Sequence, residues 1–324
     1  MQKGVNRRDF IKNAALTPAA VSVALGVGSL PAMAEGTGAG KDFTGPMPAP
    51  KGTLPMGKIG KLELSRLMLG GNLISGWSHS RDLSYVTALM KNYNTESKIL
   101  ETLEIAEING INVINLSIGD DTSFLKKHWK RGGKMMLIAQ ANPGDKNDLT
   151  QFKRAVDMGA SAVHIQGHGA EKLVEDGQVD VIARIMDLLK SQGVPAGVGA
   201  HALKVIVECE KAKVGADFYQ KTLHTRDYRS APKANENGDL GTWDNGWCKD
   251  ADEVIEFMYN VNKPFVAFKV MAAGAIPPRK AFQHAFNGGA DFVLAGMFDW
   301  QIEEDVRIAK EALTSVKRER PWRA

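Results

Sequence analysis

From residue 67 onward, short runs in which apolar and polar residues alternate are followed by segments with helical periodicity. The alternating runs predict eight strands, at residues 67–72, 111–117, 134–142, 162–168, 195–201, 217–224, 265–271 and 291–297. The periodic segments predict helices at residues 96–109, 124–129, 151–158, 179–192, 203–213, 251–261, 279–287 and 301–317. Strands and helices that alternate over roughly 260 residues are typical of an α/β protein with (β/α)8 TIM-barrel architecture.

A short two-limbed segment, Gly57–Leu64, precedes the first strand and predicts a β-hairpin that caps one end of the barrel. A doubly wound open sheet is the competing architecture for the same alternation of elements. Polar residues recur on a single face of nearly every predicted strand, as a closed barrel with a polar lumen would require. This one-sided pattern favours the barrel.

One strand carries a lysine inside its apolar run, Phe265-Val-Ala-Phe-Lys-Val-Met271. A period of two residues puts Val266, Phe268 and Val270 on one face and Lys269 on the other. Because an ammonium group is costly to pack against apolar layers, we expect the Lys269 face to line the polar lumen. The Val/Phe face is then expected to lie under the helices.

The first residues have the pattern of a targeting segment. A basic stretch, Asn6–Lys12, is followed by the weakly apolar Ala14–Leu30 and by the small residues Ala32–Ala34. The pair Arg7 and Arg8 makes the segment resemble a twin-arginine signal, and the apolar stretch is too short to span a bilayer. The resemblance implies a periplasmic or otherwise exported protein, the twin-arginine export machinery as a partner, and no stable membrane span.

The predicted organisation has three parts: a signal peptide at residues 1–34, a flexible Gly/Pro-rich linker at 35–55 and the barrel at 56–324. The 324 residues are 44% hydrophobic with a formal net charge of only +4, which does not support nucleic-acid binding. The basic C-terminal run, Lys317–Arg320, is interpreted as a solvated helix end. Whether the two cysteines, Cys209 and Cys248, form a disulfide stays open, because spacing alone does not show it.

The carboxyl ends of barrel strands form the mouth where chemistry occurs in this architecture. Histidines occur at the predicted ends of the fourth, fifth and sixth strands, namely His164 (with His168 close behind), His201 and His224. Two uses stay open: His164, His201 and His224 could hold Zn²⁺ or another divalent metal, or they could act as acids and bases. With Lys269, these three histidines are the predicted catalytic residues.

Further polar and aromatic residues at the same end of the strands are predicted to bind substrate, namely Asn72, Trp77, His79, Asn115, Gln140, Gln166 and Trp243. Trp243 belongs to a long connection after the sixth strand that also contains Trp247 and Cys248, and we interpret this connection as a lid that stacks on a sugar ring. Small residues after the last two strands, Gly274, Ala275 and Gly296, are candidates for binding the phosphate of a cofactor through their amides.

The segment Met56-Gly-Lys-Ile-Gly-Lys-Leu-Glu-Leu-Ser-Arg-Leu-Met-Leu-Gly-Gly-Asn72 resembles the entry hairpin and first strand of the aldo-keto reductases. The likeness continues through Glu96–Gly110, Ile111–Asn115 and Gly197–Gly199. It implies a (β/α)8 barrel and, by association, NADP-linked carbonyl reduction.

The chain departs from that family at the positions of the family's proton donors. The family has an aspartate at the end of the second strand and a catalytic tyrosine shortly after it, whereas this chain has Asn115–Asp120 and no tyrosine between Tyr93 and Tyr219. Gln140 falls where the third strand of the family supplies a lysine, and His164 or His168 matches the histidine of the fourth strand.

These observations predict an exported barrel enzyme that acts on a sugar or other polar carbonyl compound by metal-assisted or His/Lys acid–base chemistry, in the manner of a lyase or isomerase. One alternative is an NADP-dependent reductase with a tightly bound cofactor. Another is a non-catalytic periplasmic barrel that binds a small molecule.

Overall fold

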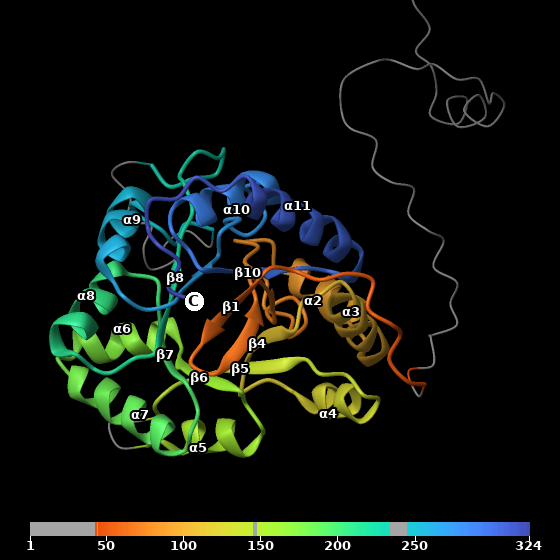
Figure 1. Cartoon of the computed structure of the whole chain (residues 1–324), viewed down its shortest axis with the longest axis horizontal. Helices are drawn as coiled ribbons and strands as arrows, with labels where there is room; N and C mark the ends of the chain where they lie inside the picture. Colours follow the sequence, from red (N-terminus) through yellow and green to blue (C-terminus); the bar gives the residue numbers. More distant parts are fainter. Residues whose placement is uncertain (1–42, 44, 145–147, 234–244) are drawn as a thin grey trace, which may run out of the picture. The chain divides into compact units, whose positions relative to one another are not determined.

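The computed structural model describes residues 43, 45–144, 148–233 and 245–324 (Figure 1). The predicted signal peptide, residues 35–42 and 44 of the predicted linker, and the candidate substrate-binding residue Trp243 lie outside these ranges.

Eight parallel strands form a closed barrel in which each strand pairs with its neighbour along the chain and the last strand pairs with the first. The strands are β3 (Leu67–Gly70), β4 (Val113–Ser117), β5 (Met136–Ala141), β6 (Ala162–Ile165), β7 (Ala196–Ala200), β8 (Phe218–Thr222), β9 (Phe265–Phe268) and β10 (Phe292–Gly296). All eight predicted strands are present, and the (β/α)8 prediction is confirmed.

Helices surround the strands as an outer ring (Figure 1). The predicted ones are α3 (Glu96–Ile108), α4 (Ser123–Lys130), α5 (Thr150–Asp157), α7 (Val179–Ser191), α8 (Leu203–Ala212), α9 (Ala251–Asn260), α10 (Pro278–Asn287) and α11 (Ile302–Thr314). A short 3-10 turn, η1 (Asp299–Gln301), leads into α11. Two helices were not predicted, α2 (Tyr85–Tyr93) and α6 (Gly167–Glu175).

The hairpin of β1 (Met56–Ile59) and β2 (Leu62–Ser65) forms a separate antiparallel sheet, as predicted. Its fully buried Ile59 and Leu64 belong to the same apolar cluster as lumen residues of the barrel strands, such as Met68 and Phe218. The hairpin therefore closes the amino-terminal end of the barrel, opposite to the carboxyl ends of the strands.

The predicted orientation of β9 is wrong. Val266 belongs to the lumen cluster and Phe268 packs against it, whereas Ala267 and Val270 belong to the cluster beneath the helices. The predicted alternation holds within β9 but not at Val270, which was predicted to share a face with Val266 and instead lies in the cluster of Ala267. Both faces of this strand are apolar, so the lysine was a misleading guide to the inner face. Lys269 follows the last residue of β9 and does not obey the alternation of that strand.

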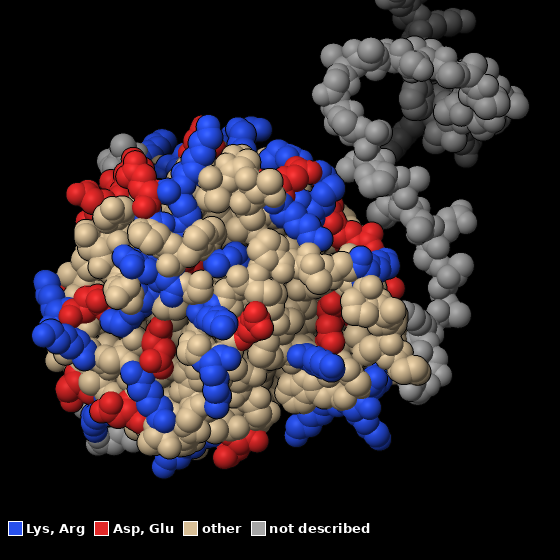
Figure 2. All heavy atoms as spheres, viewed as in Figure 1, with Lys and Arg blue, Asp and Glu red and all other residues tan. Residues whose placement is uncertain are grey.

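The basic C-terminal run is not a solvated helix end, because α11 stops at Thr314 and the last residues are tied to the barrel. The Arg320 guanidinium is 3% exposed and pairs with the buried Asp291 carboxylate at 2.7 Å. The Trp322 ring lies between the guanidinium groups of Arg66 and Arg318, at 3.8 and 3.6 Å. Figure 2, drawn in the same view as Figure 1, shows basic and acidic side chains interspersed over this face.

Part of the predicted linker also packs on the barrel. The Lys51 amide donates a hydrogen bond to the Ile108 carbonyl, and the Leu54 side chain is buried. Both cysteines, Cys209 and Cys248, are buried free thiols, so no disulfide joins them. Among the described helices, none combines the length and apolarity that a bilayer crossing requires.

Candidate active site

Lys269, His79 and Trp247 converge at the carboxyl end of the barrel from three separate connections, which follow β9, β3 and β8. The Lys269 Nζ lies 2.6 Å from the His79 Nε2 and 3.8 Å from the centre of the Trp247 ring. The rings of His79 and Trp247 are in edge contact at 5.2 Å. A cation held by an imidazole and an aromatic face is restrained in position.

The backbone at Lys269 explains how its side chain reaches this position. Lys269 has φ of 55°, in the left-handed region, and the same is true of Ala272 (46°) and Ala273 (56°). Such conformations are costly for residues other than glycine and are concentrated at functional sites. The strained turn directs Lys269 away from the regular alternation of β9 and toward the mouth.

Two histidines near Trp247 share one carboxylate. The Glu171 carboxylate lies 3.1 Å from His201 Nδ1 and 3.4 Å from His168 Nδ1. The Glu171 Oε1 also accepts hydrogen bonds from the backbone amides of His201 at 2.6 Å and Ala202 at 3.0 Å, at the start of α8. Burial raises the pKa of Glu171, but the imidazoles of His168 and His201 and the Ala202 amide outweigh it and lower this pKa to about 2, so the carboxylate is ionised at neutral pH.

His201 connects the two groups of side chains. Its ring packs on the Trp247 ring at 4.5 Å and on the His168 ring at 4.6 Å. Burial lowers the pKa of His201 to about 4, although Glu171 favours the protonated form. At neutral pH, His201 is therefore uncharged.

His224 was predicted to be catalytic, but in the structure it holds the connection that carries Trp247 in place. Its Nε2 accepts hydrogen bonds from the backbone amides of Trp247 and Cys248, both at 3.0 Å, and its Nδ1 donates to the Thr225 carbonyl at 2.8 Å. Because both ring nitrogens are engaged, neither is available to a metal or to a substrate proton.

His164 has a similar structural role deeper in the lumen. Its Nε2 accepts from the Asn115 amide at 2.9 Å, and its Nδ1 donates to the Ile165 carbonyl at 3.0 Å. Burial lowers the pKa of His164 to about 4, so it stays neutral. The Asn115 amide also lies 3.5 Å from Gln220 Oε1, which completes a polar layer beneath the mouth.

The predicted metal set of His164, His201 and His224 is therefore not brought together. Among the described residues, a different set has its ligand atoms within 4.8 Å of one another, namely His168, Glu171 and His201. Glu171 was missed because it lies on α6, where residues up to His168 had been assigned to a strand. The spacing His168-x-x-Glu171 directly after a strand is the signal that could have revealed it.

The structure places the predicted substrate-binding residues at different depths. Asn72 lies at the mouth, with its Nδ2 3.4 Å from His79 Nε2. Gln140 pairs in register with Ser117 and His164 on the lumen face, and Gln166 accepts a hydrogen bond from Asn142. Trp77 is exposed and donates to Asp120 at 3.1 Å, so it lies on the rim.

The predicted phosphate-binding amides are engaged inside their own turn. The Gly274 amide donates to the Met271 carbonyl at 2.9 Å and the Ala275 amide donates to the Ala272 carbonyl at 3.2 Å. Gly296 ends β10 and pairs with Gly70. This turn offers an anion fewer free donors than the sequence suggested.

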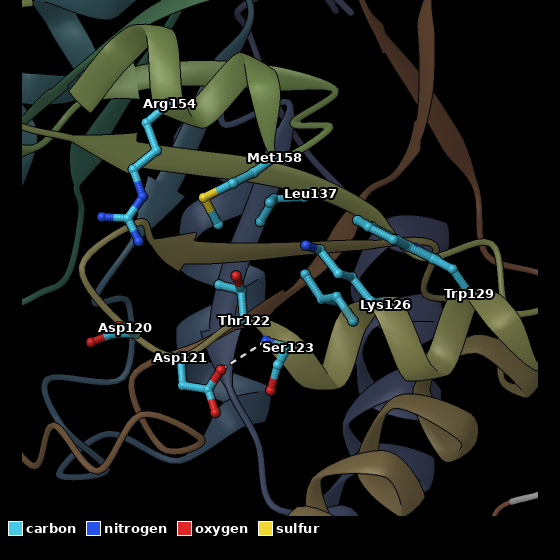
Figure 3. A pocket seen from close by; sticks show the side chains of 10 residues that line it. Asp120, Asp121, Thr122, Ser123, Lys126, Trp129, Leu137, Arg154 and Met158 are labelled. Atoms are coloured by element: carbon cyan, nitrogen blue, oxygen red, sulfur yellow. Dashed lines mark hydrogen bonds between the residues drawn. The ribbon is translucent and has the colours of Figure 1, made fainter. Parts of the chain in front are cut away.

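A cavity of about 290 Å³ lies on the flank of the barrel rather than at the mouth (Figure 3). It is lined by residues of α4, α5, β5 and the connection after β4, including Asp121, Lys126 and Arg154. Asp121 already accepts a hydrogen bond from the Ser123 amide at 2.8 Å. Lys269, His79, Trp247 and the His168–Glu171–His201 group do not line this cavity, so we place the candidate site at the mouth.

The closed barrel, the plugged amino-terminal end and the polar mouth define the chain as a (β/α)8 barrel protein. No protein-family profile and no curated protein matches the chain. Similar solved structures include a Pseudomonas aeruginosa protein provisionally described as an aldo-keto reductase, with 17% identity, a TM-score of 0.54, and 80% of this chain and 94% of that chain covered. At this identity the likeness shows the fold alone.

Two further similar solved structures have lower TM-scores. The Bacillus subtilis spore coat polysaccharide biosynthesis protein has 8% identity and a TM-score of 0.48, with 80% of this chain and 72% of that chain covered. The 3-hexulose-6-phosphate synthase of Salmonella typhimurium has 14% identity and a TM-score of 0.49, with 78% and 100% covered.

Proposed function

We propose that the protein is an exported barrel enzyme that moves a proton next to the carbonyl group of a sugar or similar polar compound, as lyases and isomerases do. The observation that carries the proposal is the 2.6 Å contact between Lys269 Nζ and His79 Nε2 beside the Trp247 face. Lys269 would turn its ammonium group to the carbonyl oxygen and polarise it. The His79 Nε2 that this movement releases would then receive the proton that leaves the neighbouring carbon.

The surroundings of this pair fit such a substrate. Trp247 is buried at the mouth, where its ring contacts Lys269 and His201 and so restrains both side chains beside a bound substrate. Asn72 and the His168–Glu171–His201 group offer hydrogen-bond partners for hydroxyl groups on either side. Two of the predicted catalytic groups, Lys269 and His201, keep a place at this site, whereas His79 replaces His164 and His224 as the proton-transfer group.

The NADP-dependent alternative receives less support from the chain. Asn115–Asp120 and Gln140 supply neither the tyrosine nor the lysine of the aldo-keto reductases, and the Gly274 and Ala275 amides are engaged within their turn. The strained backbone at Lys269 supports a functional site at the mouth, because such strain is concentrated at active sites and ligand clamps.

The test is proton exchange in D₂O. The purified protein is incubated with a panel of aldoses, ketoses and oxo acids, and the C–H signals next to each carbonyl are followed by NMR. We expect one class of compound to exchange, and Lys269→Met to slow that exchange by about 100-fold or more. Lys280→Met on α10 removes an exposed charge and should leave the rate unchanged. Binding without exchange by any compound would favour the non-catalytic alternative and reject the proposal.

A further inference from the structure

We infer that His168, Glu171 and His201 form a binding site for one divalent transition metal ion, such as Zn²⁺, at the barrel mouth. This inference extends the proposed function. The role of the ion toward a carbonyl substrate rests on that proposed function. Imidazole and carboxylate are ligands that suit Zn²⁺ and its neighbours, and two histidines with one glutamate leave positions for water and substrate.

The spacing of the ligand atoms supports the site. Ligand atoms about 2.1 Å from a tetrahedral ion lie roughly 3.4 Å from each other. The Glu171 Oε2 is 3.2 Å from His201 Nδ1 and 3.4 Å from His168 Nδ1. The three ligand atoms all lie within 4.8 Å of one another, so the two imidazoles need only a small approach to share an ion.

The other carboxylate oxygen of Glu171, Oε1, holds the side chain in position. Glu171 Oε1 accepts the amides of His201 and Ala202, which fixes the carboxylate and leaves Oε2 directed at the two imidazoles. Outer hydrogen bonds of this kind orient metal ligands and tune their affinity. The carboxylate is therefore positioned before any ion binds.

The local chain geometry brings the ligands together. His168 and Glu171 are three residues apart on α6 and so lie on one face of the helix. A Cβ atom on Gly167 would lie 2.7 Å from the His201 ring, so glycine at this position permits the start of α6 to approach His201. The His168 side chain is 57% exposed, which gives an ion access from solvent, whereas Glu171 and His201 are nearly buried.

The ion would lie next to Trp247, as Lys269 does, because the His201 ring packs on Trp247 at 4.5 Å and Lys269 Nζ lies 3.8 Å from the centre of the same ring. A carbonyl substrate with neighbouring hydroxyl groups could then have one oxygen near Lys269 and others on the ion. This arrangement selects for a polyhydroxylated compound, since a simple ketone would leave the ion without a partner.

The test is metal binding rather than activity. The folded full-length protein is freed of metal with a chelator and titrated with Zn²⁺ by calorimetry, with Co²⁺ as a spectroscopic probe of nitrogen and oxygen ligation. We expect one ion per chain. Glu171→Gln, which keeps the acceptor for the backbone amides, and His168→Ala, which changes an exposed side chain, should each weaken binding by about 100-fold or more. Glu175→Gln removes the same charge from an exposed position on the same helix and should leave affinity unchanged.

The result that would overturn the inference is the lack of stoichiometric binding, or binding that neither Glu171→Gln nor His168→Ala weakens. The group would then be a hydrogen-bonded triad only. Lys269→Met separates this outcome from failure of the proposed function: it should slow proton exchange by about 100-fold or more and retain the ion. Exchange without an ion rejects only the metal site, and an ion without exchange rejects only the proposed reaction.

Discussion

At the scale of residues, three buried histidines should make the free energy of unfolding depend on pH. Burial lowers the pKa values of His164, His201 and His224 to about 4, from an ordinary value of 6.5. In the unfolded chain these rings take up protons as the pH falls through 6.5, whereas in the folded chain they stay neutral until about pH 4. The unfolded state therefore binds more protons in this window, and stability falls as the pH falls.

We predict that the free energy of unfolding, measured with urea, decreases between pH 6.5 and pH 4 by roughly 1 to 3 kcal/mol for each of these histidines. His164→Asn should make this dependence shallower, whatever it does to stability at pH 7.5. A pH slope that is the same in His164→Asn and in the unaltered protein would show that the ring is already charged in the folded state.

The sequence pattern predicted some of the residues at the barrel mouth and missed others. Lys269 and His201 were found because a charged or titratable residue at the end of an apolar strand is conspicuous. Glu171 was not found, because its importance arises from a helix that begins at Gly167, inside a stretch that also fits strand alternation. The structural role of His224 was not predicted either, because its hydrogen bond with the Trp247 amide depends on a backbone path that no local sequence pattern encodes.

At the scale of elements, the glycines at the end of β3 control how closely the strands approach each other. A Cβ atom on Gly71 would lie 2.6 Å from the Asn115 carbonyl oxygen and 2.3 Å from the Leu116 side chain. A backbone oxygen cannot move aside cheaply, so the substitution must separate β3 from β4.

We predict that Gly71→Ala lowers the free energy of unfolding by about 1–3 kcal/mol. The control is Gly119→Ala, where the nearest atom, Ser117 Oγ, lies at 3.5 Å and φ is not positive. Chemical denaturation of both variants measures the difference. Equal stability of the two would mean that the strands tolerate a wider spacing than the contacts indicate.

His224, just after β8, fixes the position of the connection that carries Trp247 into the candidate site. Its Nε2 receives the amides of Trp247 and Cys248, so His224→Ala should free this connection and loosen the Trp247 ring. We predict that acrylamide quenches the tryptophan fluorescence of His224→Ala more strongly than that of the unaltered protein. His168→Ala removes a ring that also contacts Trp247, at 5.8 Å, without changing these amide contacts, and should increase quenching less. Equal quenching in all three proteins would remove His224 from this positioning role.

For the whole molecule, the strand pattern was sufficient to predict the barrel because each parallel strand is followed by a helix of regular period. It could not predict the C-terminal tail, whose arginines have the composition of a solvated end. The Arg320 guanidinium donates to the carbonyls of Met258, Gly289, Val261 and Lys263 as well as to Asp291. This single side chain joins the tail to the connections before β9 and β10.

We predict that Arg320→Met lowers the free energy of unfolding by about 3–5 kcal/mol, because the Asp291 carboxylate is left buried with less compensation. Lys317→Met, at an exposed position of the same tail, should change it by less than about 0.5 kcal/mol. Thermal and urea unfolding measure both. A small effect of Arg320→Met would show that Arg318 and the backbone amides satisfy Asp291 alone.

The central claim is that Lys269 and His79 act as one proton-transfer unit, and a double-mutant cycle on proton exchange in D₂O tests it most directly. Lys269→Met, His79→Gln and the double variant are compared with the unaltered protein on the substrate that exchanges. If the two residues act together, the double variant should be no slower than the worse single variant, since either change already disables the unit. Losses that multiply in the double variant would show that the two side chains act independently and would contradict the account.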